Sequence, residues 1–569
     1  MSIGATALTL VPLAPLLLAL VLPAGKGAWR LTPLAVLPAL GAVLLLPDAT
    51  RAHLPEVLLG VRLALDPVSR GFLLAAALLW GAAAVYARGD LRDDPHVVRF
   101  HVFFLLAMAG NLGLVVAADA VVFYTFFALM SLASVGLVVH RCTAEAWRAT
   151  WVYLGMAVLG ELCLFTGLIL QVHAVGDPSL ERLVLEAPPD GLAVSLIVVG
   201  LGAKAGMVPL HLWLPLAHPA APTPASAVLS GAMIKAGLLG WLYLIPRGEA
   251  MAGVGTWLLV AGLAGAWFGV LAGVLQQRPK TLLAYSSISQ MGLMTAGMGL
   301  AVQAPELGPA LTAALVFYVV HHGLAKGALF LGTGIARQVS LPWLLLGLGV
   351  PSLALAGLPL TSGAMAKSLL KTPLEATQGD YSAVLLLMAL AAAGTAVLML
   401  RFLALVLPGA GRDGGGSWAM RLPWLLLALA APLLPWCWDP AAAWALLSPG
   451  KLWTAAWPLL LGVGVALAGF LLFRRVRVRV HLPEGDLWWL LERAGRAGVQ
   501  AVARQPVLWR SPGGTLYARL GAWLVRGWGT LQDRALEAER HMRRWEVLGG
   551  GFTAWILILF GVLWWGLGG

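Results

Sequence analysis

Apolar runs of about 20 residues recur along most of the chain, and they constrain its fold more than any other feature. A helix needs about 20 apolar residues to cross the hydrocarbon core of a bilayer. Of the 569 residues, 60% are hydrophobic and 11% are charged, whereas a typical soluble domain is about 25% charged. The sequence therefore predicts an all-α polytopic membrane protein.

Breaks rich in proline, glycine and charge divide these runs into about sixteen candidate spans. The spans lie near 4–22, 31–47, 68–87, 100–117, 120–139, 150–171, 190–212, 224–246, 251–275, 281–302, 308–336, 341–366, 379–407, 421–437, 453–473 and 547–567. We expect them to group into 1–99, 100–246, 251–407 and 408–473, followed by a further segment over 474–546 and a last transmembrane helix in 547–569.

The charges of the connecting loops alternate along the chain. Basic residues lie in odd-numbered loops, at Lys26, Arg30, Arg141, Arg148, Arg278, Lys280, Arg412 and Arg421. The sixth loop instead carries Asp177, Glu181, Glu186 and Asp190. Because basic loops stay on the cytoplasmic side, we expect a protein of the cytoplasmic (inner) membrane with its N-terminus outside.

The formal net charge of +12 owes much to the region between Arg474 and Arg544. Trp, Leu and Arg mix there, interrupted by SPGG at 511–514, and this mixture is typical of a helix lying along the membrane interface. A solvated basic loop is the alternative, which the frequency of Trp and Leu disfavours. We expect a cytoplasmic-side amphipathic arm facing lipid or a partner. No RNA- or DNA-binding motif accompanies it, so no nucleic-acid partner is expected.

Five charged residues lie inside the predicted spans: Glu161, Lys204, Lys235, Lys326 and Lys367. Charges at that depth cost about 2.5–3.5 kcal/mol each on insertion scales and usually mark ion or proton pathways. A lysine near a span end can instead extend to the interface, which is a sufficient explanation for Lys326 or Lys367 alone. It does not explain Lys204 and Lys235, which lie a turn or more from the ends of their spans, or the recurrence of lysine in successive spans.

Prolines lie close to two of these lysines. Pro209 follows Lys204 by five residues, and Pro359 precedes Lys367 by eight. Proline removes a backbone hydrogen bond from a helix, and carbonyls freed at membrane depth need protein or water as partners. Broken helices in corresponding positions of two halves indicate a transport pathway. The sequence therefore predicts a proton relay, because burial disfavours the charged form of lysine and histidine shuttles protons between neighbours.

These residues lie in stretches that resemble the antiporter-like proton-translocating subunits of respiratory complex I, Mrp-type cation/proton antiporters and membrane-bound hydrogenases such as formate hydrogenlyase. The stretches are GAKAGMVPLHLWLPLAHPAAPTPASAVLSGAMIKAG (202–237), TLLAYSSISQMG (281–292), HHGLAKGALFLGTG (321–334), GLPLTSGAMAK (357–367) and, more weakly, LDPVSRGFLL (65–74). The resemblance extends from about residue 60 to residue 405. Its first stretch is similar above all to the hydrogenase and Mrp branches.

The resemblance implies two inverted five-helix repeats, over 100–246 and 251–407, each with a broken helix beside a hydrated axis. It implies that Lys204 is the broken-helix lysine, Lys235 the lysine of the next helix and Lys367 the terminal lysine of the second half-channel. It also implies that His322 and Lys326 form the connecting relay. The supporting residues are His211, His218, His321, Pro209 and Pro359. The arm and the last span are similar to the lateral-helix extension of some members.

One position departs from the family pattern. The family usually has a glutamate in the fifth span, in a pattern like FYxFWELMS, whereas this chain has FYTFFALMS at 123–131, with Ala128 at that place. Glu161 on the following span is the expected substitute partner of Lys204. Alternatively, Glu161 forms a structural ion pair, for example with an arginine of a partner protein. Ala128 also favours a scaffold whose proton path is inactive.

No flavin, nucleotide, iron–sulfur or haem motif is present, and Cys142, Cys163 and Cys437 lack metal or redox spacing. We expect no cofactor, no metal and no catalytic residue. The expected function is that of a proton-translocating membrane subunit of an energy-coupling complex, such as an oxidoreductase. Its expected partners are other membrane subunits and a peripheral cytoplasmic module. The alternatives are a Na+/H+ exchanger subunit of the Mrp type and a proton channel that energises an inorganic-carbon uptake complex with a carbon-hydrating partner.

Overall fold

The computed structural model describes residues 2–475, apart from 26, 58–59, 189, 247, 378 and 416, together with Arg493. The chain divides into two compact units. The first comprises Met1–Leu54 and Gly60–Glu484, and the second comprises Pro55–Leu59 and Gly485–Gly569. The expected arm, apart from its first two residues and Arg493, and the expected last span lie outside the described residues, as does Lys26.

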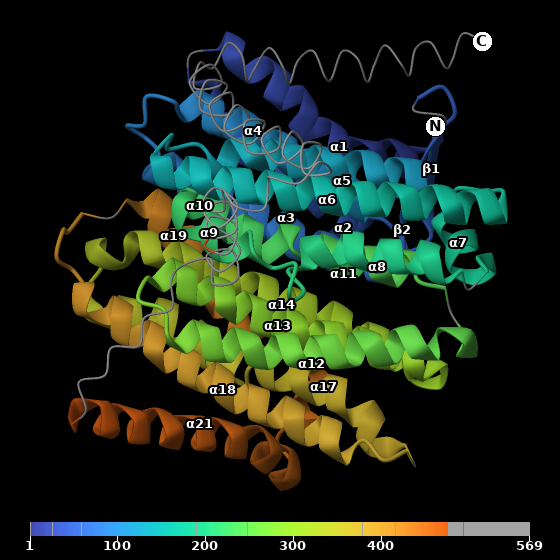
Figure 1. Cartoon of the computed structure of the whole chain (residues 1–569). Helices are drawn as coiled ribbons and strands as arrows, with labels where there is room; N and C mark the ends of the chain where they lie inside the picture. The colour runs from blue at the N-terminus through green and yellow to red at the C-terminus, as the bar shows by residue number, and fades with distance from the viewer. Residues whose placement is uncertain are drawn as a thin grey trace, which may run out of the picture. The chain divides into compact units, whose positions relative to one another are not determined.

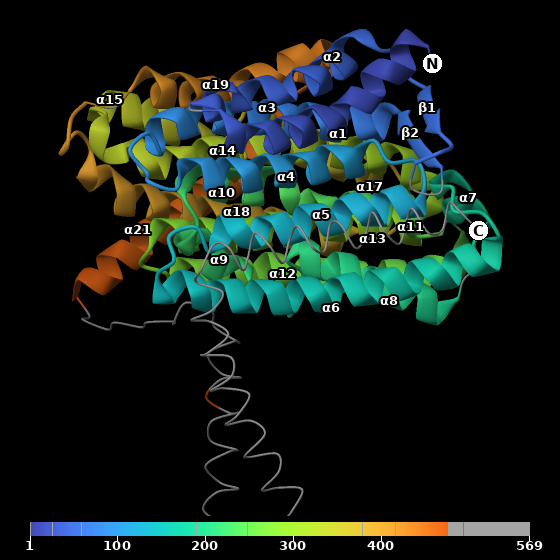
Figure 2. The same cartoon turned by 90° about the horizontal axis from the view of Figure 1, so that it is seen from above.

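The long helices of the first unit run side by side along a common direction (Figures 1 and 2). The elements up to residue 244 are α1 (Ile3–Val21), a 3-10 stretch (Ala28–Val36), α2 (Leu37–Leu45), β1 (Thr50–Leu54), β2 (Val61–Leu65), α3 (Pro67–Asp90), α4 (Val97–Val115), α5 (Ala120–Val138), α6 (Ala144–Val175), α7 (Leu180–Glu186), α8 (Gly191–Ala205), α9 (Leu214–Ala220), α10 (Thr223–Val228), a π-helical stretch (Leu229–Met233) and α11 (Lys235–Leu244).

The remaining described elements are α12 (Ala252–Val274), α13 (Pro279–Gln303), α14 (Gly308–Ile335), α15 (Leu341–Leu344), a second π-helical stretch (Leu345–Gly349), α16 (Val350–Ala356), α17 (Ser362–Ala376), α18 (Ser382–Val406), α19 (Trp418–Trp438), α20 (Pro440–Ala445) and α21 (Pro449–Arg475). Short 3-10 turns occur at 22–24, 249–251, 305–307, 336–338 and 407–409.

Within the described residues, 12 helices are long and apolar enough to cross a membrane. Two shorter apolar helices, Gly191–Ala205 and Leu341–Ala356, accompany them. Every predicted span from 4–22 to 453–473 has helix at its position. The chain is therefore a mostly helical protein with many spans, as the apolar runs predict.

Two spans are shorter than predicted because their helices break. α8 is followed by Gly206 and α16 by Gly357, and the backbone φ angles of these glycines are +70° and +97°. Glycine adopts this left-handed conformation without the penalty that a Cβ imposes, and it commonly ends helices. The breaks expected near Pro209 and Pro359 are therefore present, but each helix ends at a glycine that precedes the proline.

Two described elements, β1 and β2, are not helical. β1 pairs with β2 in an antiparallel hairpin, with Thr50 opposite Leu65. In β2, the buried residues Val61, Leu63 and Leu65 alternate with less buried ones. Such alternation is a strand signal, but a search for 20-residue apolar runs does not detect a five-residue strand. The all-α prediction was wrong at this hairpin.

α14 is a central helix of the first unit. The apolar stretch that makes it a candidate span is wholly buried, and the helix contacts α3, α13, α17 and α19. His321, His322 and Lys326 lie on it, and Lys326 is 0% exposed. A helix buried on all sides presents no face to lipid. The explanation that Lys326 extends along lipid to the interface is therefore excluded.

The stretch 65–74 begins α3 through a pair of reciprocal hydrogen bonds. The Asp66 carboxylate accepts a bond of 2.7 Å from the Ser69 amide, and the Ser69 hydroxyl accepts one of 2.8 Å from the Asp66 amide. This is a capping box, which satisfies amides that the first turn of a helix leaves unpaired. The Tyr243 hydroxyl of α11 also lies 3.0 and 2.9 Å from the two carboxylate oxygens. Asp66 therefore connects the start of α3 to the end of α11.

Asp66→Ala should destabilise the protein by about 2 kcal/mol, because it removes both the helix cap and the hydrogen bonds from Tyr243. Thermal unfolding of the full chain in detergent measures this effect. Asp66→Asn should lose less, since asparagine also caps helices. The exposed Asp93 provides the control. If Asp93→Ala and Asp66→Ala lowered the unfolding temperature equally, the role of Asp66 would be contradicted.

Candidate functional site

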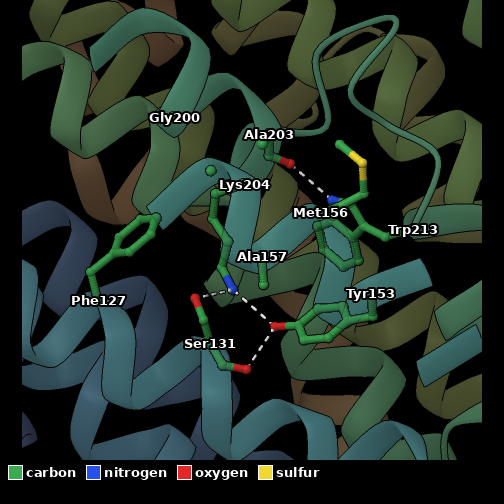
Figure 3. Close-up of a pocket in the computed structure, with 10 residues that line it drawn as sticks. Phe127, Ser131, Tyr153, Met156, Ala157, Gly200, Ala203, Lys204 and Trp213 are labelled. Carbon is green, nitrogen blue, oxygen red and sulfur yellow. Dashed lines mark hydrogen bonds between the residues drawn. The ribbon is translucent and has the colours of Figure 1, made fainter. Parts of the chain in front are cut away.

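Lys204 lies in the last turn of α8 and is buried by α5, α6 and the segment after the break (Figure 3). Its Nζ donates hydrogen bonds of 3.1 Å to Ser131 Oγ on α5 and to the Tyr153 hydroxyl on α6. The Tyr153 hydroxyl in turn donates to the Ser131 carbonyl at 3.1 Å. The rings of Phe127, Tyr153 and Trp213 have their centres 5.5–5.9 Å from Nζ, which is within cation–π range. The amine thus has polar and aromatic partners inside the protein.

Trp213 binds a main-chain carbonyl at the helix break beside this lysine. Its Nε1 donates a hydrogen bond of 2.8 Å to the carbonyl of Ala203 (Figure 3). Ala203 lies in the last turn of α8, where carbonyls have no regular helical partner. A cavity of about 10 Å³ is lined by Lys204, Trp213 and neighbouring residues. That volume is near the minimum for one water, so the site has room for about one water beside the amine.

Glu161 lies on α6, about two turns after Tyr153. It is 8% exposed, and its carboxylate interacts electrostatically with Lys204. Among the described residues, its Oε1 has no hydrogen-bond partner. Ala128 is buried on α5, about one turn before Ser131. The carboxylate expected to replace the family glutamate therefore lies within electrostatic reach of Lys204.

Lys235 begins α11, close behind the π-helical stretch Leu229–Met233. It is 2% exposed, and its Nζ donates a hydrogen bond to the carbonyl of Ser230. Single π-helical turns loosen the regular backbone pairing and are frequent at functional sites. A second cavity of about 10 Å³ lies beside Lys235, with Asn111 among its lining residues. Like Lys204, this lysine has an oxygen partner and a small cavity.

Lys326 and His322 lie one turn apart on α14, and both are 0% exposed. Lys326 Nζ donates a hydrogen bond of 2.9 Å to the carbonyl of Leu283 on α13. Lys235 interacts electrostatically with both His322 and Lys326. Neither ring nitrogen of His322 has a hydrogen-bond partner among the described residues. The fold therefore brings together three residues that lie up to 91 positions apart (235 to 326).

Lys367 and His321 meet at the second helix break. His321 Nδ1 lies 2.7 Å from Ser362 Oγ, at the start of α17. Lys367 is half-buried on the same helix, and its Nζ donates a hydrogen bond of 2.6 Å to the carbonyl of Leu355. Leu355 lies in the last turn of α16, just before Gly357. A carbonyl at the end of the broken helix is thus the partner of Lys367.

The structure adds three residues that the sequence analysis did not select: Lys371, Glu375 and Lys451. With Lys367 they line a cavity of about 30 Å³. Lys451 Nζ, on α21, lies 3.0 Å from Glu375 Oε2. The spacing of Lys367, Lys371 and Glu375 places them on one face of a helix, so their proximity could be predicted from the sequence. The contact between Lys451 and Glu375 depends on tertiary packing and could not.

Two of the supporting histidines pack against aromatic rings. The ring centroid of His211 lies 4.9 Å from that of Phe268, and the ring of His218 stacks on Phe330 at 4.6 Å. Lys280, Lys326 and Lys235 all act electrostatically on His218. His218 therefore lies within electrostatic reach of these three lysines. His211 lies near α12, which carries Phe268.

Lys280 was expected in a loop, and this was wrong. It lies in the first turn of α13, which starts at Pro279, because proline is favoured at the first helical position. Its Nζ donates hydrogen bonds of 2.9 Å to the carbonyl of Ala221 and of 3.2 Å to Ser226 Oγ. Lys280 therefore joins α13 to α10, which carries Ser226, and to the short segment before α10.

Ser131→Ala and Tyr153→Phe should each lower stability by about 1–3 kcal/mol, because each removes one of the hydrogen bonds to the buried amine of Lys204. In a Lys204→Met background, where no amine needs a partner, both substitutions should cost much less. Thermal unfolding of the single and combined variants measures this coupling. Equal costs in the two backgrounds would show that the amine does not depend on these hydroxyls.

Comparisons with known proteins show what this chain is similar to. Residues 117–393 match the family model described as NADH:quinone oxidoreductase/Mrp antiporter, TM. Hydrogenase-4 component B of Escherichia coli strain K12 is 32% identical over 286 residues, which are 48% of this chain and 43% of that protein. A probable K(+)/H(+) antiporter subunit of Rhizobium meliloti is 32% identical over 340 residues, 55% of this chain and 33% of that protein. This chain thus spans less than half the length of either relative.

A solved structure supports the fold over a longer part of the chain. The structure of the Mrp complex from Dietzia sp. DQ12-45-1b contains a chain that superposes with a TM-score of 0.71 at 24% identity. The match covers 93% of this chain and 63% of that chain. The family match includes every residue from Glu161 to Lys367 discussed above. Residues 117–393 thus match the model of the NADH:quinone oxidoreductase/Mrp antiporter family, and the resemblance found in the sequence is confirmed.

Proposed function

We propose that this chain is a proton-conducting membrane subunit of a larger energy-coupling complex. Protons move from Glu161 to Lys204 and Lys235, then through His322 and Lys326 to Lys367. The observation that carries this proposal is that each lysine of the series is hydrogen-bonded to an oxygen of the protein. Three of the four also line small cavities. Charges held in this way at membrane depth are typical of proton relays.

Electrostatic interactions between neighbouring residues of this path link the release of a proton at one residue to its uptake at the next. A carboxylate near an amine favours its charged form, and a like charge disfavours it. Glu161 stabilises the ammonium of Lys204, so a change in the charge of Glu161 alters how tightly Lys204 holds its proton. Lys235, His322 and Lys326 repel one another when charged. A proton that arrives at Lys235 therefore promotes release from Lys326 towards Lys367.

The division into two inverted repeats, over 100–246 and 251–407, is part of this proposal. It is supported by the similar breaks in α8 and α16, where a left-handed glycine is followed closely by proline. In each half a lysine lies beside the break, at Lys204 and at Lys367. Half-channels of this kind expose backbone carbonyls where ions or water need them.

The proposed setting is the cytoplasmic membrane, with the N-terminus outside and the arm of 474–546 on the cytoplasmic side. The relatives named above are components or subunits of hydrogenase and antiporter systems. We infer that this chain also assembles with other membrane subunits and with a peripheral module, which carries out redox chemistry or carbon hydration. Purification of the full chain from its native membrane identifies the module.

Exchange of a metal cation for protons is the second candidate function. The similarity to the probable K(+)/H(+) antiporter subunit of Rhizobium meliloti favours it. Proton movement in native vesicles distinguishes the two. A requirement for Na+ or K+ on the opposite side supports exchange, and unchanged proton flux in choline salts supports conduction of protons alone.

Lys204→Ala and Lys235→Ala should each abolish coupled proton movement in vesicles while the complex still assembles, because each interrupts a series of buried proton carriers. A pH-sensitive dye inside the vesicles measures the flux. Arg412→Ala, at an exposed position, is the control and should not change it. Retained pumping in both lysine variants would refute the path.

Glu161→Gln should reduce proton movement strongly, since it removes the carboxylate that acts on Lys204. Ala128→Glu in the same chain should then restore movement at least partly, because it places a carboxylate on α5 one turn from Ser131. The same dye assay compares the wild type, the single variants and the combined variant. A fully active Glu161→Gln protein would leave Glu161 with a structural role only.

A further inference from the structure

Two serine hydroxyls lie between the buried amines of Lys235 and Lys326. Ser230 Oγ and Ser287 Oγ are 2.7 Å apart, and both residues are 0% exposed. Ser230 lies in the π-helical stretch before α11, and Ser287 lies on α13. The pair therefore joins two elements that each hold a partner of one lysine.

Each serine is linked to one of the amines through a main-chain carbonyl. Lys235 Nζ donates to the carbonyl of Ser230 itself. Ser287 Oγ donates a hydrogen bond of 2.9 Å to the carbonyl of Leu283, and Lys326 Nζ donates to that same carbonyl at 2.9 Å. Two donors on one oxygen lie close together. The Ser287 hydroxyl is thus adjacent to the Lys326 amine.

His322 is the other group between these lysines. It interacts electrostatically with both, but its ring nitrogens have no hydrogen-bond partner within the described residues. The serine pair, in contrast, forms hydrogen bonds that extend from the residue bound by Lys235 to the carbonyl bound by Lys326. Between the two carbonyls that bind Lys235 and Lys326 lie the hydroxyls of Ser230, in the π-helical stretch, and Ser287, on α13, rather than the imidazole of α14.

We propose that Ser230 and Ser287 form a hydroxyl bridge that carries a proton between Lys235 and Lys326. This inference rests on the proposed function. The Lys235 ammonium gives a proton to Ser230 Oγ as the Ser230 proton passes to Ser287 Oγ. The Ser287 proton turns from the Leu283 carbonyl to the neutral Lys326 amine. Both hydroxyls are regenerated, one O–H bond is broken and one formed at each, and a single proton has moved from Lys235 to Lys326.

The same stretch of α13 contains matched control residues. Ser286 and Ser289 are also 0% exposed, and the Oγ atom of each has no hydrogen-bond partner among the described residues. Replacement of either by alanine removes a buried hydroxyl from the same helix without touching the bridge. A general effect of serine loss on the packing of α13 would appear in these controls as well.

The test measures proton flux after an imposed pH step in native vesicles that contain the full chain in its complex. Ser287→Ala should slow the flux by about tenfold or more, since a positioned proton-transfer group contributes on that order or above. Ser230→Ala should have a similar effect, and the double variant should lose little further, because the hydroxyls act in series. Ser286→Ala and Ser289→Ala should leave the flux unchanged. Ser287→Thr, which keeps the hydroxyl, should recover most of it.

The outcomes separate this bridge from the function on which it rests. Normal flux in Ser287→Ala, with Lys235→Ala inactive, overturns the bridge and leaves the proposed function standing. Equal losses of proton flux in Ser287→Ala and Ser287→Thr also overturn the bridge. Threonine keeps the hydroxyl, so equal losses would mean that Ser287 acts through packing and not through its hydroxyl. Normal flux in Lys235→Ala overturns both proposals.

Discussion

An amine buried at membrane depth must find its oxygen partners inside the protein, and the structure around the helix breaks depends on this requirement. Lys235, Lys326 and Lys367 each donate to a main-chain carbonyl. In a regular helix the main-chain carbonyls accept hydrogen bonds from amides of the same helix. Where the backbone is irregular, some carbonyl oxygens are free to accept hydrogen bonds from a lysine amine. The carbonyl of Ser230 comes from a π-helical stretch and that of Leu355 from the end of α16. Breaks that would be costly in lipid are tolerated where they meet a buried charge.

The buried amine of Lys204 also has oxygen partners, but they are not main-chain carbonyls. Its partners are the side-chain hydroxyls of Ser131 and Tyr153, while Trp213 binds the carbonyl of Ala203 beside it. Glu161 on α6 interacts electrostatically with Lys204, and Ala128 on α5 supplies no carboxylate. The region around Lys367 is unlike this, with Lys371, Glu375 and Lys451 around a larger cavity. The carboxylate near Lys204 is thus on another helix, α6, whereas Glu375 lies on α17 together with Lys367.

Much of the fold could be predicted from hydropathy, because the bilayer requires a long apolar run wherever a helix crosses it. The positions of the buried lysines followed from the same rule, since a charge inside such a run is costly. The hairpin of β1 and β2 was missed because five-residue strands leave no such run. Lys280 was misplaced because a charged residue just after Pro279 resembles a loop, although proline also starts helices.

The sequence by itself determined that this chain spans a membrane many times and that its spans contain amines, a carboxylate and histidines. Local composition decides these properties, because the free energy of placing each residue in the bilayer depends mainly on the polarity of that residue. Only the tertiary structure decided which groups meet: Ser131 and Tyr153 at Lys204, Ser230 with Ser287, and Lys451 at Glu375. These contacts join helices far apart in the chain, and hydrogen bonds of about 3 Å depend on packing geometry, which no periodicity in a single segment specifies.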